Sequence, residues 1–115
     1  GLFGLLVSDR LRGVLDRFRL PPHRYYPAPL EHRKRAVGGY WWLYLPAPDL
    51  PLTDEMPPAE AEAVIAADPA LGTVDVLRLY APARYRNCYV GGPVRAELEA
   101  AGVTGIRFGT AKLFR

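Results

Sequence analysis

Cysteine, histidine and long apolar runs are scarce in this chain, and each scarcity excludes a class of protein. The single cysteine, Cys88, excludes an intrachain disulfide and a zinc site of several thiolates, and it suits a reducing cytoplasm. The two histidines, His23 and His32, lie in a proline-broken stretch without a metal-ligand spacing. The longest apolar run, residues 36–45, is much shorter than the roughly 20 residues of a membrane-spanning helix. We therefore expect a cytoplasmic protein without metal or cofactor.

Recognisable catalytic motifs are also missing from the sequence. Ser8 lacks a G-x-S-x-G context and suits the N-cap of a helix instead. Gly91 and Gly92 match neither phosphate-binding glycine pattern, and a turn accounts for them. Cys88 lies between aromatic residues on an expected strand, where a small buried hydrophobe is more typical than a reactive thiolate. The sequence therefore predicts that the protein is not an enzyme.

Charge, by contrast, is plentiful and arranged in blocks. The chain has a net charge of +3, yet residues 49–75 hold seven acids and neither lysine nor arginine. Residues 10–35 and 76–115 are rich in lysine and arginine. Such patches steer charged partners, although solvated faces and mutually attracting segments give the same pattern.

Hydrophobic spacing predicts short elements of both kinds. An apolar run at residues 4–8 precedes Leu11, Val14 and Leu15, which recur at helical spacing, so a strand should lead into a helix at residues 9–18. The aromatic-rich residues 40–45 give the strongest strand signal, and we expect that strand to be central or covered on both faces. The remaining expected elements are an irregular edge strand at 23–32, a proline-rich loop at 46–58, helices at 58–68 and 93–101, and strands at 73–80, 85–90 and 103–108.

Together these elements indicate a single α+β domain over residues 1–115. We expect a mixed, mostly antiparallel sheet of about five to six strands with three short helices. A strand-helix unit occurs near each end, and an offset of 83 residues pairs Leu11 with Val94 and Leu15 with Leu98. Internal duplication and two independent solutions of one packing problem both remain open.

Three stretches, "LLVSDRLRGVLDRF", "YWWLYLP" and "VRAELEAAGVTGIRF", together resemble bacterial immunity proteins that neutralise polymorphic or contact-delivered toxins. The similar groups are the immunity types numbered eleven and forty-three, in which a Ser-x-[RK]-[LF] helix follows a strand. The chain also matches their C-terminal pattern, Leu-x-x-Ala-Gly-hydrophobic-x-Gly-hydrophobic-x-Phe, over residues 98–108. These are packing motifs, so they bear on fold more than on partner. Related proteins are often longer at the N-terminus, so this chain can lack an N-terminal segment, and its composition resembles that of a high-GC bacterium such as a myxobacterium.

The resemblance implies stoichiometric binding of a cognate toxin protein, without catalysis. Many such toxins attack nucleic acids with basic surfaces, so an acidic loop with apolar anchors is the preferred binding site. The expected toxin-binding residues are Asp49, Leu50, Leu52, Asp54, Glu55 and Met56. The alternative patch, for an acidic toxin, is the basic run Arg33, Lys34 and Arg35.

A small nucleic-acid-binding or regulatory domain is the alternative function. The stretch "HRKRAVGGYWWLY" places basic residues beside aromatic ones that can stack on bases. The aromatic residues of 40–45 occupy both faces of the expected strand, so at least half of them should belong to the core. A nucleic-acid-binding or regulatory domain is therefore the second interpretation, after the immunity protein.

Overall fold

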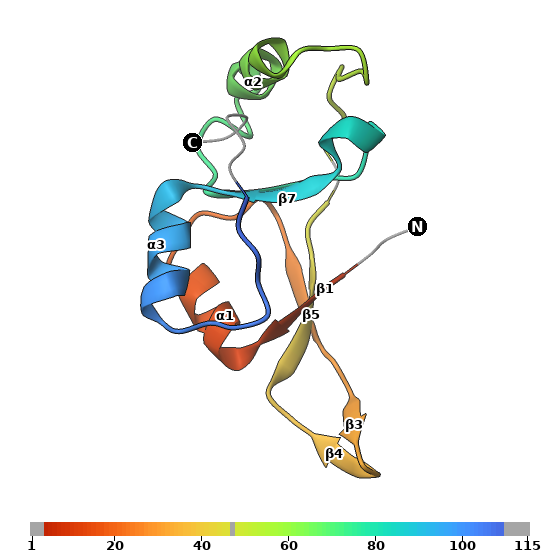
Figure 1. The fold of residues 1–115 in the computed structure, drawn as a ribbon, viewed down its shortest axis with the longest axis vertical. Coiled ribbons are helices and arrows are strands. Elements are labelled where there is room, and N and C mark those ends of the chain that lie inside the picture. Colours follow the sequence, from red (N-terminus) through yellow and green to blue (C-terminus); the bar gives the residue numbers. More distant parts are fainter. Residues whose placement is uncertain (1–3, 47, 110–115) are drawn as a thin grey trace.

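The computed structural model describes residues 4–46 and 48–109, which form a lower body, an upper lobe and a projecting hairpin (Figure 1). The molecule is elongated, with extents of 48 × 32 × 23 Å along its principal axes. None of the helices in the described residues has the length and apolar content that crossing a bilayer requires.

The lower body begins with a strand that leads directly into a helix, as expected. β1 (Leu5–Ser8) is followed by α1 (Asp9–Leu15), and the Ser8 hydroxyl accepts a hydrogen bond from the Leu11 amide at 3.2 Å. The expected N-cap is therefore confirmed. The helix ends before the expected Phe18, because the chain tightens into a turn whose amides bond to carbonyls three residues back.

A three-stranded antiparallel sheet forms the other half of the lower body. β5 (Tyr40–Tyr44) lies between β1 and β2 (Arg24–Pro27), so its predicted central position is confirmed. Pro27 has no amide proton to donate, and β2 is an edge strand where this is tolerated. The other arrangement that the sequence left open, cover on both faces, does not occur, because α1 packs on one face and Trp42 on the other is 36% exposed.

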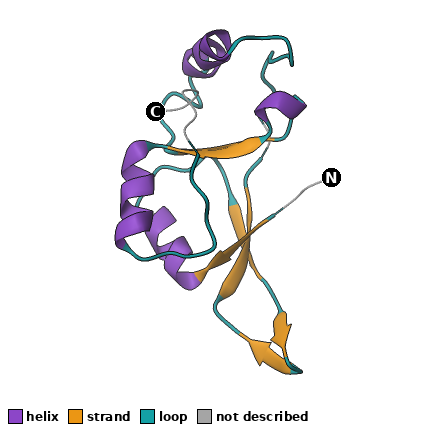
Figure 2. Cartoon of the chain, in the orientation of Figure 1, coloured by secondary structure: helices purple, strands orange, loops and turns teal. Residues whose placement is uncertain are grey.

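The projecting hairpin is formed by β3 (Leu30–His32) and β4 (Arg35–Val37) (Figure 2). β3 follows β2 along the chain, and β4 precedes β5. The sequence predicted a single irregular edge strand here. The chain instead turns back at Arg33 and Lys34, which have φ values of 52° and 62°. This conformation is the one that two-residue hairpin turns require.

A second hairpin, β6 (Val76–Leu79) and β7 (Asn87–Val90), separates the lower body from the upper lobe (Figure 1). Its side chains alternate between two cores, so both of its faces are covered. The lower core contains Val7, Val14, Leu15, Leu43, Leu45, Val76, Val94 and Leu98. The upper core contains Ala61, Ile65, Leu71, Val74, Leu77, Leu79, Tyr85 and Tyr89.

Two further helices complete these cores at the expected places. α2 (Pro58–Ala67) covers the upper core through Ala61 and Ile65, and α3 (Gly92–Ala100) lies beside α1 over the lower core (Figure 1). Gly102, with a φ of 67°, follows the end of α3 in the left-handed conformation that the sequence predicted.

The strand expected at residues 103–108 is wrong. Gly105 has a φ of 80°, which breaks an extended run, and Val103 and Phe108 pack against the lower core without pairing to a strand. Residues 103–108 therefore form an irregular segment that packs against the lower core through Val103 and Phe108.

The α+β class is confirmed, but the sheet arrangement differs from the expected single sheet. Within the described residues, three α-helices accompany seven strands that form three separate antiparallel sheets. Pro29 and the pair Gly38–Gly39 interrupt the ladder between the first sheet and the projecting hairpin. The β6–β7 hairpin forms a sheet of its own, with its faces covered by helices and loops from two different cores.

Candidate functional site

An open aromatic face on the three-stranded sheet is the most distinctive surface of the protein. Leu6 and Tyr26 pair directly with Trp42 from either side, so the three side chains form one row across the sheet. We call this surface the sheet-face patch, and its members are Leu6, Tyr26, Tyr40, Trp42 and Tyr44. Four of its residues are among the five exposed large apolar side chains in the described part of the chain, with exposures of 36–46%. Exposed apolar side chains are ordinary when scattered, but a contiguous set marks an interaction site.

A shallow hollow of about 690 Å³ lies at the Tyr44 end of this patch, the end away from the projecting hairpin. Its aromatic floor is formed by Tyr26, Trp42 and Tyr44, and Arg24 and His23 lie at its border. The Tyr26 and Tyr44 rings pack edge to face, with their centroids 5.4 Å apart.

Gly4 allows Trp42 to lie close to the chain at the start of β1. A Cβ atom at position 4 would approach Trp42 Cε3 at 3.3 Å and Tyr44 Cε2 at 3.5 Å. The sequence places its smallest residue beside its largest side chain, and a bulkier residue here would displace the aromatic floor.

The inner face of the same sheet uses its aromatic residues for folding. The Arg12 guanidinium of α1 lies between two rings, 4.2 Å from the Tyr25 centroid and 4.3 Å from a Trp41 ring. Trp41 Nε1 donates a hydrogen bond to Asp9 Oδ1 at 2.6 Å. Burial, followed by the nearby Asp16 carboxylate, raises the pKa of Tyr25 to about 12. The prediction that at least half of the aromatic residues of 40–45 belong to the core is therefore wrong, because Trp41 alone of the four packs against the lower core.

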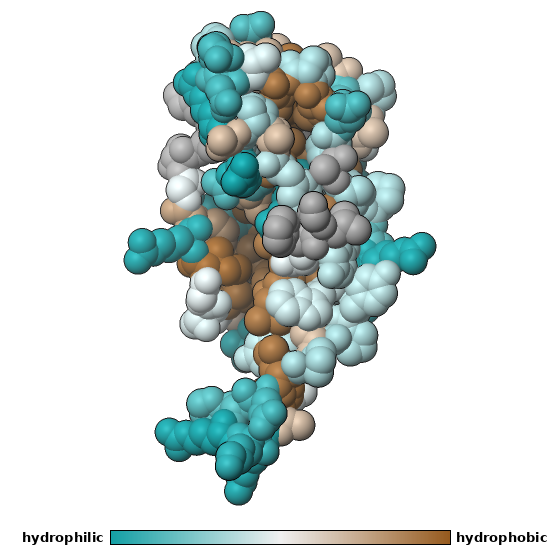
Figure 3. Space-filling view, turned by 90° about the vertical axis from the view of Figure 1, so that its right-hand side faces the viewer, coloured by the Kyte–Doolittle hydropathy of each residue, from teal (hydrophilic) through white to brown (hydrophobic). Residues whose placement is uncertain are grey.

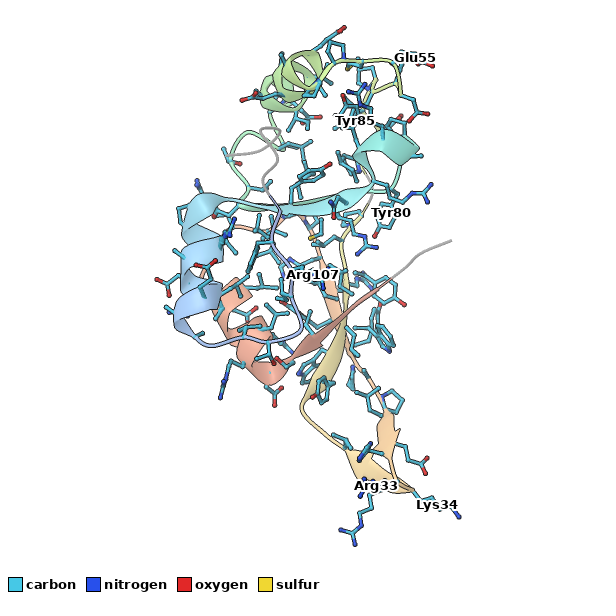
Figure 4. The ribbon with its side chains drawn as sticks, in the orientation of Figure 1. Arg33, Lys34, Glu55, Tyr80, Tyr85 and Arg107 are labelled. Atoms are coloured by element: carbon cyan, nitrogen blue, oxygen red, sulfur yellow. The ribbon has the colours of Figure 1, made fainter. Side chains whose placement is uncertain are left out.

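The basic run lies at the far tip of the projecting hairpin, where Arg33 and Lys34 extend away from the body (Figure 4). All three of its cations, Arg35 included, are exposed, and the acidic residue of the hairpin is Glu31 in β3. Figure 3 shows the hairpin as a strongly hydrophilic projection below the mixed surface of the body. None of the three cations forms a salt bridge within the described residues. We call β3, β4 and their turn the basic hairpin.

The acidic loop, residues 48–56, differs from its expected form in the orientation of its apolar residues. Leu50, Leu52 and Met56 are half-buried and pack against the upper core of the protein itself. Their apolar surface is used in folding, so they do not form the exposed anchors that the sequence interpretation assigned to them. Burial of their apolar area stabilises the folded chain, and the adjacent upper core is the nearest apolar surface against which these side chains can pack.

The carboxylates of the loop do remain exposed, on a segment that is held in place. Asp54 Oδ1 accepts a hydrogen bond from the Arg84 amide at 3.0 Å, and Arg84 Nη1 donates to the carbonyls of Asp54 and Met56 at 3.1 Å each. The Tyr85 hydroxyl donates to the Met56 carbonyl. These hydrogen bonds hold the end of the loop, Asp54 to Met56, against the segment that contains Arg84 and Tyr85. Glu55 lies at the opposite end of the molecule from Arg33 (Figure 4).

The groups considered for catalysis or metal binding lie apart. No cluster of three or more His, Cys, Asp or Glu side chains suited to a metal occurs in residues 4–46 and 48–109. Cys88 packs against the lower core, and burial raises the pKa of its thiol, which disfavours the reactive thiolate. His23 contacts the Pro21 carbonyl through Nδ1 at 3.0 Å, and His32 lies on the basic hairpin.

The comparisons with known proteins give no relatives. No family model matches the chain, and it has no significant match among curated proteins or among solved structures.

The sequence offered Tyr40, Trp42 and Tyr44 only as part of the alternative nucleic-acid surface, and it did not indicate that Leu6 and Tyr26 lie beside them. The signal for the sheet-face patch was the alternation in residues 40–44, since every second residue must face the same way. Which set faces solvent depends on where α1 docks, and α1 docks on the Trp41 side. The sequence contained the pattern but not that choice.

Proposed function

We propose that this protein is a cytoplasmic immunity protein, which neutralises a bacterial toxin by binding it stoichiometrically and without catalysis. The observation that carries the proposal is the sheet-face patch, a contiguous aromatic surface on a regular sheet. The resemblance of residues 5–18, 40–46 and 94–108 to immunity proteins supplies the kind of partner.

The composition and rigidity of the patch suit protein binding. Tryptophan, tyrosine and arginine are enriched among residues that dominate interface energies, and Trp42, Tyr26 and Arg24 lie together around the hollow. The patch belongs to paired strands, so binding requires little ordering of the backbone.

The acidic loop supports the same function as a second candidate face. Asp49, Asp54 and Glu55 are exposed, and the contacts of Arg84 hold this segment against the upper lobe. A fixed array of carboxylates suits a toxin with a basic, nucleic-acid-binding surface. The loop lacks outward-facing anchors, however, so we place it after the sheet-face patch.

The function is tested by producing this chain together with any product of a neighbouring gene that is toxic when it is produced alone. Cells that produce the toxin should survive when they also produce this protein, and purified toxin should lose activity in proportion to added protein until one equivalent is present. The loss should reverse when the two proteins are separated. Complete inactivation by a small fraction of an equivalent, with a chemically altered toxin, would show an enzyme instead.

A nucleic-acid-binding domain is the second candidate function, and one observation favours it. The exposed rings of Trp42 and Tyr26 lie on β5 and β2, and the same two chain segments lead into the basic hairpin with its cations. Aromatic rings beside cations are the features that single-stranded nucleic acids bind. Binding of single-stranded RNA that weakens steeply with added salt, without protection against the toxin, would favour this role.

A further inference from the structure

The sheet-face patch and the basic hairpin lie on one continuous ribbon. β2 runs into β3, and β4 runs into β5, so the strands that hold Tyr26 and Trp42 also hold the hairpin. The junction is short, because the Ala28 amide still donates to the Tyr40 carbonyl at 3.0 Å. A partner that covers the patch up to Tyr40 therefore also reaches the base of the hairpin.

The turn of the hairpin holds two cations in a backbone conformation that residues other than Gly and Asn seldom adopt. Arg33 and Lys34 both have positive φ values, 52° and 62°, in a turn that normally holds Asn-Gly. Side chains with a Cβ atom disfavour this conformation, so Asn-Gly would fold better at these two positions than Arg-Lys. Strain kept at an exposed tip is typical of residues whose side chains are used in binding.

We infer that the patch and the basic hairpin form one docking surface for an acidic face of a partner protein, which inserts an apolar side chain into the hollow beside Trp42. The inference rests on the proposed function, because it names the chemistry by which the toxin is recognised. The hollow, with Pro22 and Pro46 at its border, holds an apolar side chain. Arg33, Lys34 and Arg35 pair with carboxylates at the rim and accelerate association.

The arrangement favours a protein over a single-stranded nucleic acid. A single-stranded nucleic acid needs cations along the whole groove that its backbone follows. Three of the cations here are instead gathered at the tip of the hairpin. Among the residues that line the hollow, Arg24 is the one arginine or lysine. Leu6 at the edge of the aromatic row offers aliphatic contact rather than a stacking surface. The edge-to-face packing of Tyr26 on Tyr44 also engages part of the ring surface that bases would use.

The test uses two labelled peptides and the complete chain. One peptide carries a central leucine flanked by aspartates and glutamates, and the matched peptide has serine in place of leucine. Wild-type protein should bind the leucine peptide more tightly, with affinity that falls as salt rises above about 150 mM. Changing Arg33, Lys34 and Arg35 to glutamine should weaken binding about tenfold and flatten the salt dependence.

The hollow is tested separately from the hairpin. Trp42→Ala should weaken binding of the leucine peptide about thirtyfold, the loss expected for one interface hot spot, and should change binding of the serine peptide little. Tyr26→Ser, on an edge strand, repeats this test if Trp42→Ala fails to fold. Changing Asp49, Asp54 and Glu55 to their amides is the matched control, and this variant should bind the peptide like the wild type.

Specific outcomes overturn the inference. These are no binding of either peptide, equal binding by the wild type and both hollow variants, or tighter binding of an oligouridine of about 15 nucleotides to the same surface. Toxin protection that is lost with the three amides and kept with the three glutamines also overturns it. A protein that binds the leucine peptide as expected but gives no toxin protection contradicts the proposed function and leaves the docking chemistry standing.

Discussion

At the scale of single residues, Arg12 joins α1 to the sheet by two ring contacts. Its guanidinium lies 4.2 Å and 4.3 Å from rings on two different strands, and its side chain is 32% exposed. An ion pair with Asp16 at 3.8 Å adds little, since exposed pairs contribute weakly. The stacking on Tyr25 and Trp41 is therefore the main contribution of this residue.

Arg12→Ala should lower the free energy of unfolding by about 1–2 kcal/mol, the range of a partly desolvated cation–π pair plus lost packing. Arg17→Ala is the matched control in the turn after α1, where the lost contact is an exposed ion pair with Glu97, and it should change stability by less than about 0.5 kcal/mol. Urea unfolding measures both. Equal effects of the two substitutions would contradict the stacking role.

Ionisation of Tyr25 should lower the free energy of unfolding in alkaline solution. Its pKa is raised to about 12 in the folded protein, against 10.0 for the free side chain, because burial disfavours the phenolate. The folded state therefore holds its proton more tightly, so this stabilisation is complete below pH 10 and is lost as pH rises through about 12. Tyr25→Phe should show a smaller fall in stability across this window. An unchanged pH profile in urea unfolding would contradict the assignment.

At the scale of elements, the basic hairpin is a two-stranded ribbon whose turn requires positive φ values, which Arg33 and Lys34 disfavour. Arg33→Asn together with Lys34→Gly supplies the residues that this turn favours. Hydrogen exchange of the amides in β3 and β4 should slow about fivefold or more, corresponding to about 1 kcal/mol of local stability. The melting temperature should change little, because the hairpin projects away from both cores. Faster exchange in this variant would show that the turn is not strained.

The two strand-helix units should contribute similarly to the lower core. Leu15 of α1 and Leu98 of α3 are 5% and 3% exposed and belong to the same cluster. Leu15→Ala and Leu98→Ala should each destabilise the protein by about 2–4 kcal/mol in thermal or urea unfolding. A substitution that leaves the melting temperature at the wild-type value would exclude its helix from the core.

Much of this element order could be predicted from the sequence, because local signals fixed it. Ser8, Pro58 and Gly102 mark helix ends by their own chemistry, and the structure has helix ends at all three. The hairpin turn at Arg33 and Lys34 could not be predicted, because neither residue favours positive φ. The inward orientation of Leu50 and Met56 depends on contacts with residues distant in sequence, which local patterns do not contain.

At the scale of the whole molecule, two cores share one dividing hairpin and should unfold together. Val76 faces the lower core and Leu77 the upper core, so neither core can open without exposing a face of β6. Fluorescence of Trp41 and Trp42 in the lower body and hydrogen exchange in α2 should therefore report the same unfolding free energy. Two separate values would show independent lobes.

The shared hairpin also makes the molecule indivisible. Removing residues 46–72 would uncover the upper face of β6 and β7, including Leu77, Leu79 and Tyr89, on a short two-stranded sheet with open edges. Such a shortened chain would keep all of its sheet-face patch and basic hairpin and yet be prone to associate through the uncovered strands. The upper lobe therefore acts as the cover that keeps the apolar upper face of β6 and β7 away from solvent and from other chains.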